Sequence, residues 1–444
     1  MSITAPVRSN RQHGLPHYRW VILGVGFVSQ GLCFSVWYAF PILFVAMLAE
    51  FGWSRAEAAG AFSILVVTNG VLGPIVGGLV ERIGLRLILP AGALILGLGV
   101  IGMTTTTDLW QFYIYYGFIG GVGLGLCGWI PTVTNLMGWF PKTLGTASGI
   151  ISAGTSLSIL ALIPLLQRVI DTDGWRAAAW ILGGLIIAIV APANALLQRR
   201  PPHPADRLSS RGQASVDPSV LDREWVGRPW TLSMALRTRR YWLVFFSFVA
   251  STLAAQMVIA HQVAYLVDNG YDASIAAFSL GLVGMGSIVG KLTWGHVSDR
   301  VGRECSWGLT ATFSIAALGL LILAGSVQSV PILVIFGLLL GIGYSVGATV
   351  NPNIVADLFR GPAFGAIFGA LVIGSSIGSA LGAWIGGLVF DLTGSYLAAF
   401  GLVALSLLLG TFLVWLAAPR KVRRIPYPIR WLAASRSIAE HHPP

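Results

Sequence analysis

Lys291 is the residue whose type and position most directly suggest chemistry. It lies inside a long apolar run, eight residues before Asp299, and eight residues of helix span about 12 Å. Cationic side chains at such a depth in a membrane usually face a cavity or a partner. One ammonium group there could offer charge and hydrogen-bond donors to the carboxylate of an anion. The alternative is a lysine whose long side chain carries its charge out to the polar surface.

Three aromatic residues could line a cavity around such a group. Tyr38, Trp129 and Tyr344 each lie beside or close to Pro or Gly, and both residue types loosen a helix. Ordinary packing is the alternative for each of them. We take these three as candidate substrate-binding residues.

Groups that could carry a proton are few. His261 lies within an apolar run, where it could bind substrate or carry a proton, because the charge of histidine changes near neutral pH. A hydrogen-bonded core histidine is the alternative. No Asp or Glu falls deep in a predicted span, and Asp268 lies at the end of one. We expect Asp268, His261 or Lys291 to carry any proton that moves with a substrate.

The composition indicates a polytopic membrane protein. Of the 444 residues, 55% are hydrophobic and only 10% are charged, and the mean hydropathy is +0.77. Soluble proteins carry about 25% charged residues, so this chain could not cover a soluble domain with polar groups. A soluble enzyme and a secreted disulfide scaffold are therefore disfavoured. The apolar runs are continuous rather than alternating, which also argues against a β-barrel.

Twelve apolar runs are long enough to be membrane spans. We expect them at 20–47, 58–80, 87–104, 109–138, 144–169, 176–197, 241–266, 275–296, 306–325, 330–351, 363–390 and 396–417. The predicted organisation is an N-tail at 1–19, a six-helix domain at 20–197, a linker at 198–240, a second six-helix domain at 241–417 and a C-tail at 418–444. A short surface helix is expected in the linker around 232–240.

The basic residues are distributed unevenly about these spans. Of 28 Lys and Arg, 24 fall in the tails, the linker and the loops after even-numbered spans, and only Arg55, Arg168 and Arg176 fall on the other side. Because cytoplasmic segments carry the excess of Lys and Arg, we expect both termini and the linker in the cytoplasm. Anionic membrane lipid, not nucleic acid, is the expected partner of this charge. The three cysteines lack metal-ligand or redox spacing, so no metal and no cofactor are expected.

A short charged motif follows the second span of each half. GGLVERIG at 77–84 recurs as GHVSDRVG at 295–302, an offset of 218 residues. A carboxylate at a helix end can accept from helix N-termini and pair with arginine. We predict a gating latch on the cytoplasmic side, formed by Glu81, Arg82 and Arg86 in the first half and by Asp299, Arg300 and Arg303 in the second.

A second motif repeats at nearly the same distance. Gly145, Gly149, Gly154 and Asp171 recur as Gly365, Gly369, Gly374 and Asp391, an offset of 220 residues. Two different motifs at one offset, about half the chain, indicate the duplication of a six-helix unit. Repeats of this kind place a substrate at the interface of the halves, near the membrane midplane.

Further motifs resemble those of monocarboxylate transporter-like members of the major facilitator superfamily, which include bacterial oxalate/formate antiporter relatives. They are YAFP at 38–41, FGWSRA at 51–56, WFPK at 139–142, ASG at 147–149, GY at 343–344, ADLF at 356–359 and DLTGSY at 391–396. The resemblance covers nearly the whole chain. It implies an all-α membrane protein with twelve transmembrane helices in two pseudo-symmetric six-helix halves, the major facilitator fold.

The resemblance also implies roles for the candidate residues. Lys291, followed by LTWG, takes the place of the family's basic residue in span 8, an arginine that binds the substrate carboxylate. His261, Asp268 and Tyr344 match positions implicated in bacterial relatives. The family's planar guanidinium is replaced here by a lysine, which cannot form the same two-pronged contact.

Three departures from the family pattern bear on the substrate. Ile42 stands where animal members have a lysine, and Ser287 where they have an aspartate. No Lys or Arg occurs between Arg360 and Arg420, the region where oxalate transporters carry a second cation. One cation suits a monocarboxylate better than a dicarboxylate, because a second buried negative charge would be unpaired.

We therefore expect a secondary transporter of a small monocarboxylate such as lactate or pyruvate, with proton symport. The expected location is the cell membrane, the inner membrane if the protein is bacterial, and no obligate protein partner is expected. The alternatives are an organic anion exchanger, an efflux transporter of the same fold, or a non-transporting membrane sensor. An enzyme is not expected, because one lysine and one histidine in the spans are too few for catalytic chemistry.

Overall fold

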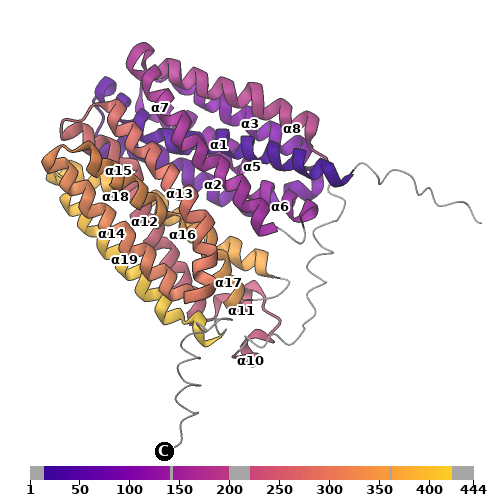
Figure 1. The fold of residues 1–444 in the computed structure, drawn as a ribbon. Coiled ribbons are helices and arrows are strands. Elements are labelled where there is room, and N and C mark those ends of the chain that lie inside the picture. The colour runs from indigo at the N-terminus through magenta and orange to yellow at the C-terminus, as the bar shows by residue number, and fades with distance from the viewer. Residues whose placement is uncertain (1–14, 141–143, 200–220, 360–362, 423–444) are drawn as a thin grey trace, which may run out of the picture.

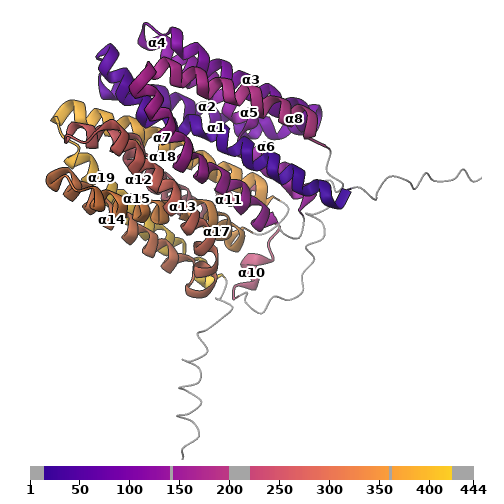
Figure 2. The same cartoon turned by 45° about the horizontal axis from the view of Figure 1, so that its top comes forward.

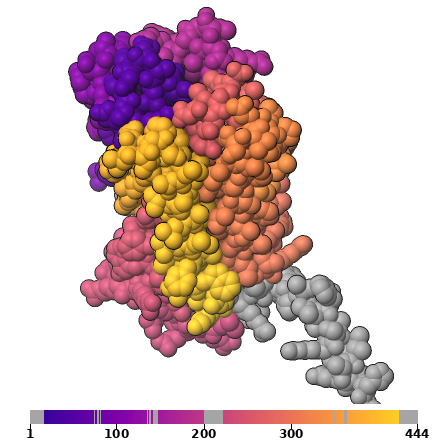
Figure 3. Space-filling view, turned by 90° about the vertical axis from the view of Figure 1, so that its left-hand side faces the viewer, coloured from indigo at the N-terminus to yellow at the C-terminus, as the bar shows by residue number. Residues whose placement is uncertain are grey.

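The computed structural model describes residues 15–140, 144–199, 221–359 and 363–422, and within these ranges every regular element is a helix. The helices lie in two groups side by side, the first coloured indigo to magenta and the second rose through orange to yellow (Figures 1 and 2). Figure 3 shows the two groups meeting on one face of the molecule, with the first above the second. We call these groups the first half and the second half.

The first half contains the helices before residue 200. They are α1 (Leu15–Phe51), α2 (Arg55–Ile83), α3 (Leu85–Gly102), η1 (Met103–Thr105), α4 (Leu109–Phe112), the π-helix η2 (Tyr113–Ile119), α5 (Gly120–Cys127), α6 (Trp129–Trp139), α7 (Leu144–Leu185), the π-helix η3 (Ile186–Val190) and α8 (Ala191–Leu197). The elements from α4 to α6 follow one another as the fourth span. Gly128, with φ −81° and ψ −148°, interrupts this span directly before Trp129.

The second half follows two short linker helices, α10 (Arg223–Val226) and α11 (Leu232–Leu236). Its elements are α12 (Arg239–Asp268), α13 (Ala273–Val301), α14 (Arg303–Val327), α15 (Val330–Tyr344), α16 (Val346–Thr349), α17 (Asn351–Leu358), α18 (Phe364–Thr393), α19 (Leu397–Ala417) and η4 (Pro419–Lys421). The elements α15, α16 and α17 form the tenth span, which is interrupted at Ser345, the residue after Tyr344.

The described ranges contain the twelve expected spans. Ten helices are long and apolar enough to cross a membrane, one of them the 51-residue stretch Ala147–Leu197, and Val330–Tyr344 is a shorter apolar helix. The chain leaves helical geometry at Gly174 inside α7, where φ is 83° and ψ is 166°. Residues 147–197 are therefore two span-length segments joined at Gly174. Glycine permits this join, because it adopts positive φ without a steric penalty.

Some element boundaries differ from those we predicted. α1 extends beyond the predicted 20–47 at both ends, since its polar flanking residues continue the helix outside the apolar run. The linker helix expected around 232–240 is divided, because the Thr238 hydroxyl accepts from the Tyr241 amide and so starts α12 at Arg239. A side chain in this N-cap position favours a new helix start over continuation of the preceding one.

The halves meet along a seam formed by helices of both. α2 packs against α18, α7 against α13, and α1 against α12. We call the end of the bundle that contains Arg55, Asp171, Asp268 and Asp391 the Arg55 end. The opposite end, where α2 and α13 finish and where α10 and α11 lie (Figure 1), is the linker end.

Close helix contacts within the second half depend on glycine. A Cβ atom at Gly382 of α18 would collide with the backbone carbonyl of Leu253 in α12, whereas a Cβ at Gly369 of the same helix would have no neighbour within 4 Å. Small residues of this kind let helices approach closely in lipid.

We predict that Gly382→Ala destabilises the protein, because the α12 and α18 backbones must move apart to admit the methyl group. The expected cost is about 1–3 kcal/mol, measured as a lower melting temperature of the purified protein in detergent. The matched control is Gly369→Ala, which should leave the melting temperature unchanged or slightly raised. Equal melting temperatures for the two variants would contradict this account of the contact.

Candidate functional site

The Lys291 side chain crosses the seam between the halves. Its Nζ donates to the carbonyl of Ser152 at 3.2 Å and to the hydroxyl of Ser156 at 2.9 Å. Both acceptors belong to α7 of the first half, whereas Lys291 belongs to α13 of the second. The ammonium group therefore lies between the halves and does not extend toward a lipid-facing surface.

A chain of hydroxyl groups continues from the ammonium group. The Ser156 and Ser287 hydroxyls lie 2.7 Å apart, and Ser287 donates to the Gly284 carbonyl at 3.1 Å. Ser156 therefore accepts from Lys291 and donates to Ser287. An ammonium group has three N–H donors, and two of them are used in this way. Between residues that the structure describes, Lys291 forms no ion pair, so its positive charge is held by neutral oxygens alone.

Small residues bring α13 close enough to α7 for this contact. A Cβ at Gly284 would lie 2.6 Å from the Ser156 carbonyl oxygen. Ser287, one turn from Lys291, is 1% exposed and presents only a hydroxymethyl group to α7. A lysine on α13 can therefore bond to the α7 backbone itself.

The predicted residues Tyr38 and Tyr344 also meet across the seam. Their hydroxyl oxygens lie 2.5 Å apart, joining α1 of the first half to α15 of the second. Gly290 of α13 lies directly against Ser345, since a Cβ there would collide with the Ser345 hydroxyl. Lys291 follows Gly290 in the chain, and Tyr344 precedes Ser345. The structure therefore brings Lys291, Tyr38 and Tyr344 to the same seam.

Trp129 lies elsewhere in the first half. It packs at the edge of an apolar cluster that includes Ile22, Trp139 and Ile151. It begins α6 immediately after the break at Gly128. Its surroundings in this structure are those of a packing residue.

His261 is fully buried and has a partner for each ring nitrogen. Nε2 lies 2.7 Å from the Ala383 carbonyl, and Nδ1 lies 3.1 Å from the Tyr396 hydroxyl. A carbonyl can only accept, so the network assigns the proton to Nε2. Its ring also meets Phe44 of the first half edge-on, with centroids 5.3 Å apart. His261 is thus a hydrogen-bonded core residue in this state of the protein.

Arg55 connects His261 to Asp268 at one end of the seam. Its Nη1 donates to the same Tyr396 hydroxyl at 2.5 Å, and its Nη2 pairs with the Asp268 carboxylate at 2.7 Å. The guanidinium carbon lies 3.7 Å from the centroid of the Phe390 ring. Arg55 belongs to the first half and all its partners belong to the second, so this network holds the halves together at the Arg55 end.

Asp391 closes the same end through the backbone. Its carboxylate accepts from the amides of Arg55 at 3.0 Å and Ala56 at 2.7 Å, the first residues of α2. The repeat-related Asp171 accepts from the Ser274 hydroxyl at the start of α13, at 2.7 Å. Each half thus presents an aspartate to the start of a helix in the other half, where a negative charge is favoured.

Three of the predicted latch residues, Arg86, Asp299 and Arg303, bond within their own halves at the linker end. Arg303 pairs with Asp299 at 2.6 Å and with Asp357 at 3.0 Å, which joins the end of α13 to α17. Arg86 donates to the Ala195 carbonyl of α8 at 2.8 Å. Arg82 and Arg300 are exposed, and the Glu81 side chain lies outside what the structure describes. Between described residues, no hydrogen bond or ion pair joins the two halves at this end.

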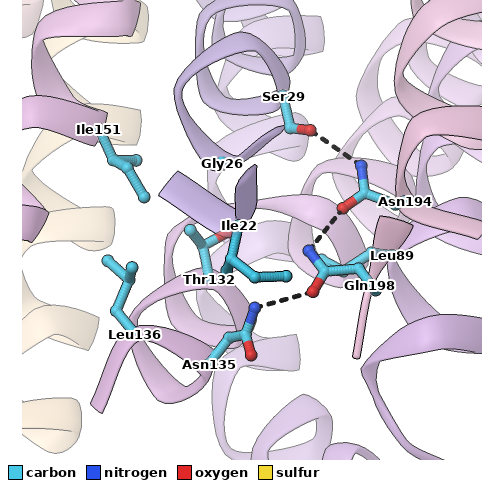
Figure 4. A pocket seen from close by; sticks show the side chains of 10 residues that line it. All are labelled: Ile22, Gly26, Ser29, Leu89, Thr132, Asn135, Leu136, Ile151, Asn194 and Gln198. Atoms are coloured by element: carbon cyan, nitrogen blue, oxygen red, sulfur yellow. Dashed lines mark hydrogen bonds between the residues drawn. The ribbon is translucent and has the colours of Figure 1, made fainter. Parts of the chain in front are cut away.

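A small cavity in the first half is separate from the seam. It measures about 10 Å³ and is bordered by a chain of side-chain hydrogen bonds (Figure 4). Asn194 donates to Ser29 at 2.8 Å, Gln198 to Asn194 at 3.0 Å, and Asn135 to Gln198 at 2.9 Å. This chain of hydrogen bonds ties α1, α6 and α8 together near the linker end. The volume of the cavity is too small for an organic substrate.

The sequence pattern of the Major Facilitator Superfamily matches residues 26–327 and 265–440 of the chain. The chain belongs to this superfamily. The match confirms the predicted fold, and it agrees with the two halves and their central seam. Among solved structures, a bacterial homologue of the human lysosomal transporter Spinster, in an inward-facing and unoccupied conformation, superposes with a TM-score of 0.63. It is 16% identical, and the alignment covers 92% of this chain and 99% of that one, so the likeness concerns the fold.

Several relatives in the superfamily are monocarboxylate transporters. Monocarboxylate transporter 13 of Rattus norvegicus is 26% identical over 401 residues, 88% of this chain and 87% of that protein. Monocarboxylate transporter 2 of Homo sapiens is 24% identical over 385 residues, 85% of this chain and 80% of that protein. The expectations of a monocarboxylate transporter-like member of the superfamily and of a transport protein rather than an enzyme are thus confirmed.

Sequence reasoning did not identify most partners of the candidate residues. Ser152 and Ser156 were not singled out, because nothing local distinguishes them from other serines in apolar runs. Arg55 was noted only for its side of the membrane. Two features of the sequence could have indicated a role for Arg55 in joining the halves: its place in the FGWSRA motif and the repeat of Asp171 and Asp391.

We predict that Asp391→Asn loosens the Arg55 end, because the amide loses the negative charge and one of two acceptor oxygens. The reporter is Ser63→Cys in a background without the three native cysteines. Ser63 is suitable because its hydroxyl bonds the Ala380 carbonyl across the seam at 2.8 Å. Alkylation by an impermeant maleimide should become about tenfold faster, as for the loss of a charge-assisted hydrogen bond. The control is Asp173→Asn, whose carboxylate bonds only the neighbouring Thr172 among the described residues. Unchanged labelling in both variants would contradict a closing role for Asp391.

Proposed function

We propose that the chain is a secondary active transporter of a small monocarboxylate such as lactate or pyruvate, working as a proton symporter by alternating access. The observation that supports this most is the Lys291 ammonium group at the seam, which bonds a carbonyl and a hydroxyl of the other half and has no anionic partner among the described residues. A buried positive charge without a counter-ion favours the binding of an anion. The relatives named monocarboxylate transporters agree with a carboxylate as that anion.

A single cation favours one carboxylate per substrate. No Lys or Arg occurs in the sequence between Arg360 and Arg420, so α18 offers no second positive charge. A dicarboxylate would bring a second negative charge without a partner into the seam, which is costly in a low-dielectric environment. Tyr38 and Tyr344 supply hydroxyl groups for the rest of the substrate. The two other candidate residues, Trp129 and His261, pack outside this contact in the present state.

Alternating access follows from the distribution of contacts along the seam. The halves are bonded to each other through Arg55, Asp391 and Asp171 at one end, and the described residues form no such bond at the linker end. We place the linker end in the cytoplasm, because most Lys and Arg lie there and such asymmetry marks cytoplasmic segments. The structure then corresponds to a state closed to the outside. The proposed location is the cell membrane, the inner membrane if the protein is bacterial. The proposed latch lies on the cytoplasmic side and consists of Glu81, Arg82, Arg86, Asp299, Arg300 and Arg303.

Proton coupling would use Asp268, His261 or Lys291. Asp268 is paired with Arg55, and His261 is joined to the same arginine through the Tyr396 hydroxyl. Protonation of the Asp268 carboxylate would remove its ion pair with Arg55, and this would favour separation of the halves at the Arg55 end. Lys291 would couple proton movement to substrate movement instead if its ammonium group releases a proton together with the substrate.

We predict that Lys291→Met abolishes transport. In liposomes containing the purified protein, uptake of labelled lactate under an inward proton gradient should fall by at least tenfold, as for the loss of a charged hydrogen bond to the substrate. Lys291→Arg, which keeps the charge, should retain a measurable part of the uptake. The matched control is Lys421→Met, which removes an exposed lysine from η4 at the linker end. Uptake that survives Lys291→Met would rule out the role assigned to this residue.

We also predict that uptake depends on the proton gradient and that Asp268→Asn reduces this dependence. The amide cannot change its charge, and it pairs weakly with Arg55. Uptake with and without an inward gradient is compared for the parent, Asp268→Asn and the control Asp173→Asn. Accelerated exchange of internal for external lactate with no effect of pH in the parent would favour the alternative, an organic anion exchanger. The absence of a carboxylate beside Lys291 among the described residues is the feature that supports this alternative.

A further inference from the structure

A groove of about 490 Å³ lies on the second half at the linker end, away from the Lys291 seam. It is lined by Trp225 of α10, by Thr238, Arg239, Arg240 and Leu243 at the start of α12, and by Leu416 near the end of α19. We propose that this groove binds the phosphodiester headgroup of one anionic phospholipid. The proposal is independent of the identity of the transported substrate.

The charges that line the groove favour an anion. Arg239 and Arg240 are adjacent, no acidic residue lines the groove, and the first turn of α12 contains no acidic residue. Neither arginine forms an ion pair with another residue in the described part of the chain. The start of a helix is itself partly positive, so the two guanidinium groups add to a positive potential that favours an anion in the groove. Arginine is the side chain best suited to hold a phosphate through paired hydrogen bonds.

One of these guanidinium groups has a buried donor without an acceptor. The Arg240 guanidinium carbon lies 4.2 Å from the centroid of the Trp225 ring. Its Nη1 nitrogen is buried and has no hydrogen-bond partner among the residues that the structure describes. A buried N–H group without an acceptor is unfavourable, and a phosphate oxygen in the groove would supply the acceptor.

The wall opposite α12 is held in place by other contacts. The Trp225 Nε1 donates to the Leu358 carbonyl at the end of α17, at 2.6 Å. The amides of Leu221 and Asp222 donate to the Val422 carbonyl at 2.9 and 3.3 Å. The stacked Trp225 ring is therefore positioned by the protein before any ligand binds, which lowers the entropic cost of binding.

The apolar surroundings favour a lipid over a soluble phosphate ester. Leu243 and Leu416 form the apolar part of the lining. Large exposed apolar side chains lie near them on the same helices, among them Trp242 and Phe246 of α12 and Trp415 of α19. Tryptophan is typical of the level of the lipid headgroups in membrane proteins. A phospholipid would place its phosphate against the arginines and its acyl chains along this surface.

The test is native mass spectrometry of the full-length protein in detergent, titrated with phosphatidylglycerol and, separately, with phosphatidylcholine. The parent should retain one phosphatidylglycerol with an affinity at least tenfold above that for phosphatidylcholine. Arg239→Gln/Arg240→Gln should lower the phosphatidylglycerol affinity about tenfold or more, since the variant loses the charge-assisted hydrogen bonds from two groove-lining guanidinium groups to the phosphate. The matched control, Arg223→Gln/Arg237→Gln, removes two exposed arginines from the same end that do not line the groove, and it should change the affinity by less than twofold.

Further measurements separate the other outcomes. Equal losses in the two double variants would overturn the proposal in favour of diffuse attraction to basic charge, and no loss in either would overturn it outright. Displacement of phosphatidylglycerol by an equal concentration of glycerol 3-phosphate would show a soluble phosphate ester as the occupant and would also overturn it. Melting temperatures in phosphatidylcholine show whether each variant is folded. If the double variant fails to fold, the single variant Arg239→Gln, which changes an exposed side chain, replaces it. This variant should weaken phosphatidylglycerol binding severalfold. Unchanged binding would overturn the proposal.

Discussion

A positive charge enclosed between two helical halves is the constraint on which the rest of this molecule depends. Lys291 extends from α13 to the Ser152 carbonyl and the Ser156 hydroxyl of α7. Neutral oxygens solvate an ammonium group only partly, so the charge remains available to an anion. Glycine and serine at the α7–α13 contact make this reach possible, because they allow the two backbones to lie close together.

The contacts that surround this charge are distributed asymmetrically along the seam. At the Arg55 end, the side chain of Arg55 and the carboxylates of Asp391 and Asp171 bind one half to the other. At the linker end, the ion pairs of Arg303 and the bond from Arg86 stay inside their own halves. Polar bonds join the halves at one end of the seam and stay within each half at the other end. This distribution is consistent with two units that move relative to each other around the central lysine.

The sequence allowed the spans and the depth of Lys291 to be predicted, because hydropathy is a local property. It did not allow the pairing across the seam to be predicted. Tyr38 and Tyr344 are 306 residues apart, and Lys291 and Ser152 are 139 apart, so no periodicity connects them. Trp129 was predicted as a candidate from its neighbouring Gly and Pro, but those residues also permit the break at Gly128 that turns its ring toward an apolar cluster. The equivalence of Asp171 and Asp391 was visible as a repeat, whereas their contacts to helix starts required coordinates.

The backbone turn at Gly174 has a mechanical consequence. The helical segment that carries Ser152 and Ser156 and the segment that leads to Asn194 are two arms joined at this one non-helical residue. A connection of one residue leaves little freedom between the arm that bonds Lys291 and the arm that continues into α8. The hydrogen-bond chain from Ser29 to Asn135 then joins the end of that second arm to α1 and α6. Through this one glycine, the segment that holds the buried ammonium group is connected directly to the polar contacts that bind three helices of the first half together.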